Sequence, residues 1–389
     1  MFIHSIQHGP SQGIFAAIKL IEEAKSEVLL STYVLEGQGH GGTCLIDALR
    51  KTNARTIKIL SNHYTFHSKK TLKYLGRIAC VANKLRNDQT LHIRVWKHNF
   101  FNSNHAKFVV VDETKCALGG YNFQEAFFMP NDLAWSDLGI TLTSVSLGKT
   151  LRQHFDTMWQ GASDVSCNQT LKMISCQCPK QAVGRVLQIN QTVTDYVMLT
   201  QLPQCLFIHS QKSQAFYSIM QCLSTAEKSI DILSPNVIDT CIWELLTHKL
   251  STIKNFSVRI LTNDGLNKSQ SFMVLMQKEK IYFCNQRKKW KHLQIRFSND
   301  TTKNKKKQYL ETDEKEWTVL IDHSKYFNVD LKHFYIGSFN MDAISLHASG
   351  ESGVIILNEP HLAQKTNHFL FEFCWFKATE LNCFFAYEQ

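Results

Sequence analysis

A polar pattern that occurs twice is the feature that most limits what this chain can fold into. The pattern reads H-x-K-x4-D-x6-G-[GS]-x-N. Its first copy runs from His105 to Asn122, and its second runs from His323 to Asn340. Two copies in the same register, far apart in one chain, indicate an internal duplication. We therefore expect two copies of one structural unit.

The segments that precede the two copies also repeat. In each half, apolar residues at helical spacing are followed by a short apolar strand and then by a second helix and a second strand. Strands that alternate with helices indicate an α/β architecture. The expected pairs of segments are helices at 12–24 and 214–226, strands at 28–31 and 230–233, helices at 43–51 and 242–250, and strands at 57–60 and 258–261.

The length of 389 residues is enough for two or more domains. The stretch near 160–190 is polar and poor in predicted structure, so we place the boundary there. The expected domains are residues 1–175, with the first copy, and residues 190–389, with the second.

The residue types in the pattern suit phosphodiester chemistry. In an extended strand, residues two apart share a face, so His105 points with Lys107 and His323 points with Lys325. If the copies face each other, two imidazoles and two ammonium groups surround one anion. One imidazole then attacks phosphorus, and the other protonates the leaving alkoxide. The lysines offset charge on the phosphoryl oxygens, so we expect no metal and no cofactor.

Further polar residues complete the expected site. Asn122 and Asn340 lie on small-residue turns and are expected to donate hydrogen bonds. Each imidazole needs an acceptor that fixes its tautomer. Glu351 is the candidate from the second half, and Asp137 is the candidate from the first, although it lies further from its glycine turn. Which acid pairs with which histidine stays open.

The doubled pattern resembles the HKD signature of the phospholipase D superfamily, and the two-copy chain looks most like bacterial cardiolipin synthase-type members. The resemblance implies two tandem phospholipase D-like α-β-α sandwich domains, related by internal duplication, with the active site at their interface. It also implies a phosphohistidine intermediate, with His105 as the nucleophile and His323 as the acid and base.

The resemblance makes Asp112 and Asp330 motif members, for which we expect a structural role in bonding backbone or a turn. Gly120 departs from the family pattern, because a serine is usual there. A hydroxyl donor is therefore missing from the first half. The remaining motif positions are Gly119, Gly337 and Ser338.

The net charge of +10 comes largely from one segment. Between Arg287 and Lys307 there are nine Lys or Arg residues and one acid. Two interpretations stay open: a solvated loop, or a contact with an anionic membrane surface, where Trp and basic residues sit at headgroup level. The same segment could also hold a nucleic-acid backbone. The residues proposed for membrane or anion contact are Arg287, Lys288, Lys289, Trp290 and Lys291.

Twelve cysteines at irregular spacings are expected to be buried, reduced thiols. A reducing compartment follows from that interpretation. No segment is apolar enough for a transmembrane helix, and the N-terminus lacks the features of a secretory signal. We expect a cytoplasmic protein that associates peripherally with membranes, and export by an unconventional route stays open.

Three functions remain to be compared. The first is a phospholipid phosphodiesterase or transphosphatidylase, either a phospholipase D or a cardiolipin synthase-like enzyme. The second is a metal-independent nuclease or other phosphodiesterase, and the third is a catalytically silent lipid-binding relative. Under the first function the partners are a phospholipid substrate and an anionic membrane, without nucleic acid. Since both half-sites are in one chain, we expect a monomer.

Overall fold

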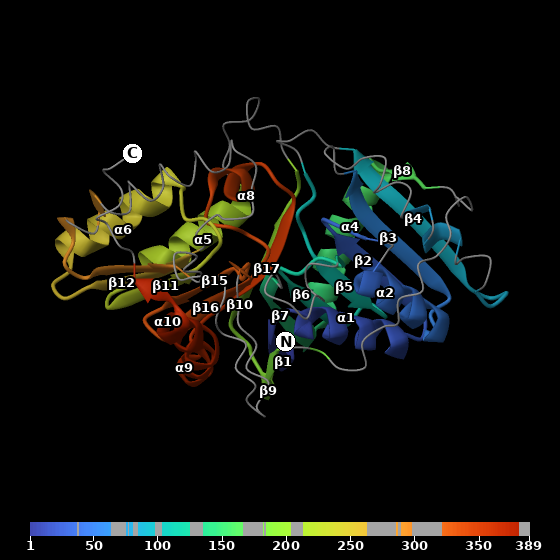
Figure 1. The fold of residues 1–389 in the computed structure, drawn as a ribbon, viewed down its shortest axis with the longest axis horizontal. Helices are drawn as coiled ribbons and strands as arrows, with labels where there is room; N and C mark the ends of the chain where they lie inside the picture. The colour runs from blue at the N-terminus through green and yellow to red at the C-terminus, as the bar shows by residue number, and fades with distance from the viewer. Residues whose placement is uncertain are drawn as a thin grey trace, which may run out of the picture.

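The computed structural model describes most of the chain, and all statements below concern the described part. In it, two β-sheets lie next to each other, each with helices on its faces (Figure 1). The described residues are 1–36, 39–63, 75–76, 78–80, 85–97, 103–124, 135–165, 182, 184–203, 213–262, 285–286, 289–297 and 321–380.

The first sheet has the strand order β8-β4-β3-β2-β5-β6-β7-β1-β9. Its strands are β1 (Phe2–Gly9), β2 (Glu27–Thr32), β3 (Thr56–His63), β4 (Thr90–Lys97), β5 (Phe108–Val111), β6 (Lys115–Gly119), β7 (Trp135–Thr143), β8 (Ser163–Asp164) and β9 (Arg185–Thr192). Its helices are α1 (Gln12–Glu23), α2 (Gly39–Lys51) and α4 (Val145–Gln160).

The second sheet has the order β10-β17-β16-β15-β11-β12-β13-β18. Its strands are β10 (Tyr196–Gln201), β11 (Ser229–Leu233), β12 (Ser257–Thr262), β13 (Leu293–Phe297), β15 (Tyr326–Val329), β16 (His333–Gly337), β17 (Glu351–Ile356) and β18 (Thr379–Glu380), and the short β14 (Ile321–Asp322) pairs with β7 of the first sheet. The helical segments are α5 (Gln214–Ser224), α6 (Thr240–Thr252), α8 (Ala343–His347), α9 (Pro360–Asn367), the π-helical η4 (His368–Glu372) and α10 (Phe373–Lys377).

The two sheets have the same topology. The order β4-β3-β2-β5-β6-β7-β1 in the first corresponds strand for strand to β13-β12-β11-β15-β16-β17-β10 in the second. In both, the first three strands are parallel and the motif strand is antiparallel to its neighbours. The predicted duplication and the α/β class are confirmed.

The chain passes from one sheet to the other between Thr192 and Tyr196. Strand β9 pairs with β1, so it belongs to the first sheet. Strand β10 pairs with β17 in the second. The change of sheet therefore falls later than residue 190, where the sequence placed the start of the second domain, because the polar strand β9 extends the first sheet.

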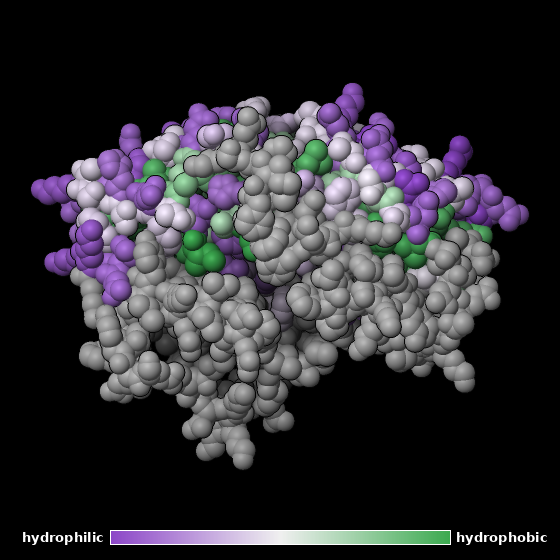
Figure 2. Space-filling model, turned by 90° about the horizontal axis from the view of Figure 1, so that it is seen from above, coloured by the Kyte–Doolittle hydropathy of each residue, from purple (hydrophilic) through white to green (hydrophobic). Residues whose placement is uncertain are grey.

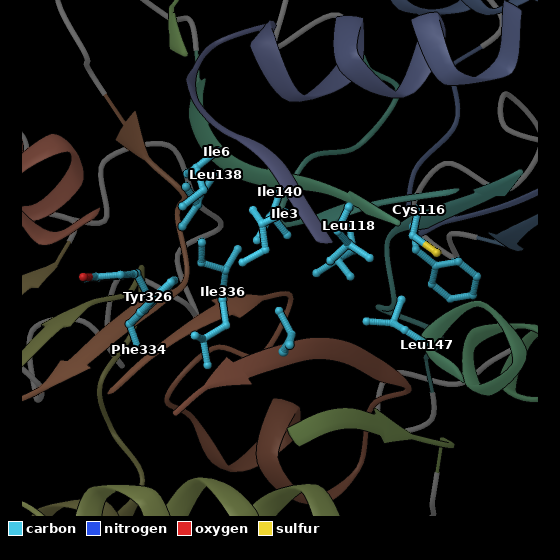
Figure 3. Close-up of a cluster of buried hydrophobic side chains, with 14 of the residues drawn as sticks. Ile3, Ile6, Cys116, Leu118, Leu138, Ile140, Leu147, Tyr326, Phe334 and Ile336 are labelled. Carbon is cyan, nitrogen blue, oxygen red and sulfur yellow. The ribbon is translucent and has the colours of Figure 1, made fainter. Parts of the chain in front are cut away.

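Three hydrophobic clusters fill the layers between these elements. One lies between the first sheet and helices α1 and α2, and a second lies between the second sheet and helices α5 and α6. The third is shared by both halves, as Figure 3 shows for Ile3, Ile6, Phe334 and Ile336. The interface between the halves is therefore a continuous apolar core, which fixes how the two motifs meet.

Two of the cysteines are not reduced thiols. Cys44 and Cys80 are disulfide-bonded, so the expectation of reduced thiols is wrong for them. Irregular spacing in the sequence does not reveal which cysteines come close in space. Among the described residues, the free cysteines are Cys116, Cys222, Cys241 and Cys374.

Within the described residues, no helix combines the length and apolar character needed to cross a bilayer.

Candidate active site

The two motifs meet because each is bonded to a strand of the opposite half. The backbone N–H of His105 donates to the carbonyl of Gly350 at 2.6 Å, just before β17. The N–H of His323 donates to the carbonyl of Ser136 in β7 at 2.8 Å. Both histidines lie in the short links that lead into the motif strands β5 and β15. These reciprocal bonds bring both histidine links to the domain interface.

Each imidazole is bonded to a carboxylate from the other half. His105 Nδ1 lies 2.9 Å and 3.0 Å from the two Glu351 oxygens. His323 Nδ1 lies 2.8 Å from Asp137 Oδ2. The carboxylates are buried, at 0% and 1% exposure, and the imidazoles are 13% and 14% exposed. The structure thus brings together the acids that the sequence suggested, in a crossed pairing that it left open.

Asp137 and Glu351 occupy equivalent positions in their sheets. Gly119 pairs with Gly139, and Gly337 pairs with Gly353. Each acid lies two residues before the second glycine of its pair. The greater sequence distance in the first half therefore comes from a longer connection and not from a different place in the fold.

Gly120 is matched to Asp137. A Cβ at residue 120 would lie 2.2 Å from Asp137 Oδ1, which leaves no room for a side chain. In the second half, the Ser338 hydroxyl donates to Glu351 Oε2 and also to the Ser352 carbonyl at 3.1 Å. In the first half, the Asp137 carboxylate thus occupies the space beside Gly120 that a serine side chain would need.

The turn backbone is already engaged in both halves. The N–H of Gly120 donates to the Leu138 carbonyl at 3.0 Å, and the N–H of Ser338 donates to the Ser352 carbonyl at 2.8 Å. Neither amide is therefore placed to bind a phosphate in this structure. We conclude that the Gly/Ser position supports the acid behind the imidazole.

Both motif lysines are buried beside the imidazoles. Lys107 Nζ donates to the His105 carbonyl at 2.6 Å, and Lys325 Nζ donates to the His323 carbonyl. Lys325 Nζ also lies 2.6 Å from Nδ1 and 3.1 Å from Nε2 of the His323 ring. Burial lowers the pKa of Lys107 well below its usual value, opposed by the charge of Glu351. The positive charge of Lys325, from the second half, lowers the pKa of both Lys107 and His105 in the first half. The two half-sites are therefore electrostatically coupled.

The two imidazole–acid pairs differ electrostatically. Burial lowers the pKa of His105 to about 4, although Glu351 opposes this. His105 is therefore neutral at neutral pH, with Nδ1–H donating to Glu351. Burial raises the pKa of Asp137 to about 7, opposed by the charge of Lys325. The Asp137 carboxyl therefore titrates near neutral pH.

The two motif asparagines differ in their contacts. Asn122 Oδ1 accepts from the backbone N–H of Val34 at 3.2 Å, which fixes the loop after β2. Asn340 Oδ1 is buried, and no hydrogen-bond partner for it is found within the described parts of the chain. Because buried polar atoms are normally bonded, the Asn340 Oδ1 atom is open to a hydrogen-bond donor, whereas a phosphoryl oxygen would bind the side-chain NH₂ group.

Two aromatic side chains that the motif did not indicate border the imidazoles. The Tyr33 ring lies edge-on to His105, with ring centroids 5.0 Å apart. The Trp135 ring lies 5.2 Å from that of His323. Tyr33 follows β2 and Trp135 begins β7. Only the strand order places them at the site, so neither could be found from motif spacing.

The motif aspartates bond backbone at the ends of strands β5 and β15, away from the histidine links. The Asp112 carboxylate accepts from the amides of Lys25, Ser26 and Glu27 at 2.8–3.3 Å. Asp330 accepts from three equivalent amides, those of Glu227, Lys228 and Ser229, at 2.7–2.8 Å. Each aspartate also starts a hairpin turn, with φ of 49° and 54°. Aspartate tolerates this left-handed conformation better than most residues.

The basic segment lies apart from the histidines where it is described. Arg287 and Lys288 are outside the described residues. Residues 289–291 lie just before β13, separated from it by His292. The start of β13 is level with the end of β15 in the sheet, whereas His323 lies before the start of β15. Trp290 packs partly against the apolar core of the second half. This part of the segment is therefore no component of the histidine site.

Comparison with known families agrees with this geometry. A family model described as "Cardiolipin synthase, PLD-like domain" matches residues 17–159 and 219–375. The two matches contain one motif each and together span most of the chain. The chain therefore belongs to this family of the phospholipase D superfamily.

Solved structures show the same fold. Phosphatidylserine synthase from Haemophilus influenzae Rd KW20 matches with a TM-score of 0.71 at 10% identity, over 98% of this chain and 89% of that one. Polyphosphate kinase from Porphyromonas gingivalis matches with a TM-score of 0.53 at 10% identity, over 96% of this chain and 50% of the kinase. By sequence, no curated protein matched. The resemblance at this identity concerns the fold.

Proposed function

We propose that the chain is a phospholipid phosphodiesterase or transphosphatidylase that acts through a phosphohistidine. The observation that carries the proposal is the crossed pairing of His105 with Glu351 and of His323 with Asp137, around two buried lysines. Membership of a family described by cardiolipin synthase supports the choice of a phospholipid.

His105 is the proposed nucleophile. Its imidazole is neutral at neutral pH, and its Nδ1–H donates to Glu351, so Nε2 carries the free lone pair. Nε2 attacks phosphorus and forms an N–P bond, while the P–O bond to the leaving alcohol breaks.

His323 is the proposed acid and base. The Asp137 carboxyl, which titrates near neutral pH, orients the His323 imidazole, and that imidazole delivers a proton to the leaving alkoxide. In the second step, water or an alcohol attacks phosphorus and returns a proton to His323, and the N–P bond breaks. Hydrolysis and transfer differ only in the attacking group.

The lysines and Asn340 are proposed to hold the phosphoryl oxygens. Burial disfavours the charged form of Lys107, and an anionic phosphate bound beside it would favour that form. With phosphate bound, both buried lysines supply positive charge in a desolvated site, where it acts strongly on developing negative charge. Asn340 contributes a side-chain amide from the second turn. These groups supply the charge that a metal ion would otherwise provide at the reacting phosphate.

The proposed cellular partner is an anionic membrane surface. The described face in Figure 2 is mainly hydrophilic, and its hydrophobic patches are small and separate. Attraction by basic residues such as Lys289 and Lys291, both exposed, is therefore the proposed mode of contact. We also propose that the active unit is a monomer, because both imidazole–acid pairs lie within one chain.

Product analysis by mass spectrometry tests the reaction. The purified chain is incubated in EDTA with vesicles of phosphatidylglycerol and phosphatidylcholine, beside His105→Ala and His323→Ala variants. Phosphatidic acid from the wild type alone indicates hydrolysis, and cardiolipin indicates transfer. His154→Ala is a matched control, since His154 is a buried histidine with a pKa also lowered to about 4 by burial but with no place in the motif.

The wild type could instead turn over no lipid and cleave single-stranded DNA, with both motif variants inactive. That result would indicate a nucleic-acid substrate in place of the lipid. Turnover that survives in both variants would refute the histidine mechanism itself.

A further inference from the structure

A second cluster of chemically active side chains lies next to the proposed active site. His8 is near the end of β1, Asp322 is the last residue of β14, and Cys374 is in α10. Three distant parts of the chain thus bring an imidazole, a carboxylate and a thiol together. The three residues are buried, with exposures of 0%, 1% and 7%. The proposed phosphodiester mechanism uses none of them.

The three donor atoms have the spacing of a metal site. His8 Nε2 lies 3.4 Å from Asp322 Oδ2, Cys374 Sγ lies 3.3 Å from the same oxygen, and Sγ lies 3.7 Å from Nε2. Tetrahedral Zn²⁺ with ordinary bond lengths places nitrogen and oxygen about 3.3 Å apart, sulfur and oxygen about 3.5 Å and sulfur and nitrogen about 3.6 Å. Each observed distance is within a few tenths of an ångström of these values.

We propose that His8, Asp322 and Cys374 bind one Zn²⁺ ion as a structural site. The combination of a soft thiolate with an imidazole selects zinc over magnesium and calcium, which prefer oxygen ligands only. Binding releases the thiol proton of Cys374, so one thiolate and one carboxylate balance the charge of the ion.

Ser136 is a candidate for the fourth ligand. Its hydroxyl oxygen lies 3.3 Å from His8 Nε2, which is again the nitrogen–oxygen distance of a zinc tetrahedron. This hydroxyl is therefore the proposed fourth ligand. Because all three main ligands are buried, the site is closed, as structural zinc sites are.

The alternative role of a Cys–His–Asp nucleophile does not fit the same residues. Burial raises the pKa of the Cys374 thiol well above its usual value, together with the charge of Asp322. A reactive cysteine instead needs access to substrate and a lowered pKa. Without a metal, the thiol donates a hydrogen bond to Asp322, and this metal-free arrangement is the one that the experiment must distinguish.

The position of the cluster gives the ion a role beside the reaction. Asp322 directly precedes His323 and pairs with Ser136, which directly precedes Asp137. The ion would therefore hold the two backbone segments that carry the proposed acid–base pair. It would also connect the first strand and the last helix, so it is expected to stabilise the contact between the halves without touching the substrate.

Metal analysis of the full chain tests this site without any substrate. The wild type is loaded with Zn²⁺, passed through a desalting column and analysed by inductively coupled plasma mass spectrometry. About one zinc per chain is expected. Cys374→Ala and the nearly isosteric Asp322→Asn should lose it. Cys222→Ala removes another buried free cysteine, in α5, and should keep it.

Two further readouts make the result specific. With Co²⁺ in place of Zn²⁺, the wild type and Cys222→Ala should show a thiolate-to-cobalt charge-transfer band that Cys374→Ala lacks. Zinc should raise the melting temperature of the wild type by roughly 5 °C or more, but not that of Asp322→Asn. A folded wild type that retains no zinc would refute the site, and so would equal zinc in the wild type and both ligand variants.

Discussion

Substitution of Gly120 by serine should damage the proposed acid–base pair from a position that does not touch substrate. The added Cβ would lie 2.2 Å from Asp137 Oδ1 and 2.8 Å from Asp137 Cγ, and ordinary contact begins at 3.4 Å. The carboxylate must therefore move by about 1 Å. That movement breaks the 2.8 Å bond to His323 Nδ1.

The size of the effect follows from the role of the acid. Misplacement by about 1 Å costs roughly 10²-fold in rate, and loss of the carboxylate that orients the histidine of a Ser-His-Asp triad costs about 10⁴-fold. We expect kcat to fall within this range. KM should change little, because the change does not remove a group that holds the phosphate.

Two variants control for other causes. Gly120→Ala carries the same Cβ without a hydroxyl and should be as damaged as Gly120→Ser. Ser338→Gly removes the hydroxyl bond to Glu351 without any clash, and should cost no more than about tenfold, or about 1.4 kcal/mol. Steady-state kinetics on a soluble phosphodiester, with melting temperatures to verify folding, measure all three. If Gly120→Ser kept more than half of the wild-type kcat, the reasoning about Asp137 would be refuted.

Three further predictions follow from the structure. Because the pKa of His105 is lowered to about 4, activity should fall as the pH drops through that value and the nucleophile is protonated. The free energy of unfolding should also decrease between about pH 6.5 and 4, since the unfolded chain binds a proton there that the folded chain does not. Kinetics at acid pH measure the first effect, and urea titrations measure the second. Asp112→Ala and Asp330→Ala should each lower the free energy of unfolding by about 1–3 kcal/mol, because each removes hydrogen bonds to backbone N–H groups. The kcat of the folded fraction should stay near that of the wild type. A loss of kcat without a loss of stability would contradict this prediction. Replacing Lys289 and Lys291 by Gln should weaken binding to anionic vesicles in flotation assays and leave turnover of a soluble substrate unchanged, and equal losses in both assays would assign these lysines to the site.

The two-unit fold was predictable from the sequence because the duplication repeats both the apolar periodicity and the polar motif. Helix and strand positions followed from where apolar residues recur, as in α1 and β2. The two His–Lys pairs of the candidate site followed from the motif alone, since their spacing is the same in both copies.

The crossed pairing was not predictable, for a physical reason. Whether Glu351 bonds the histidine of its own half or of the other depends on how the two sheets dock. That docking is set by an apolar core contributed by both halves, including Ile6 and Phe334. Asp137 and Glu351 are equivalent, but the connection before Asp137 is longer than the one before Glu351, so the sequence does not show this. The strand pairing of Gly119 with Gly139 and of Gly337 with Gly353 reveals it.

The cluster of His8, Asp322 and Cys374 illustrates the same limit more strongly. Its members have no common motif and come from the first strand, the residue before the second motif and the last helix. No spacing rule joins positions so far apart in the sequence. They meet only because β14 crosses over to pair with β7.

The crossed imidazole–carboxylate bonds also restrict how the molecule moves during turnover. Many two-domain enzymes open and close by a hinge between their lobes. Here, a hinge motion would separate His105 from Glu351 and His323 from Asp137 at once, and would expose the shared apolar core. The halves should therefore behave as one rigid body during turnover, and substrate should reach the histidines without a change in the docking of the two sheets.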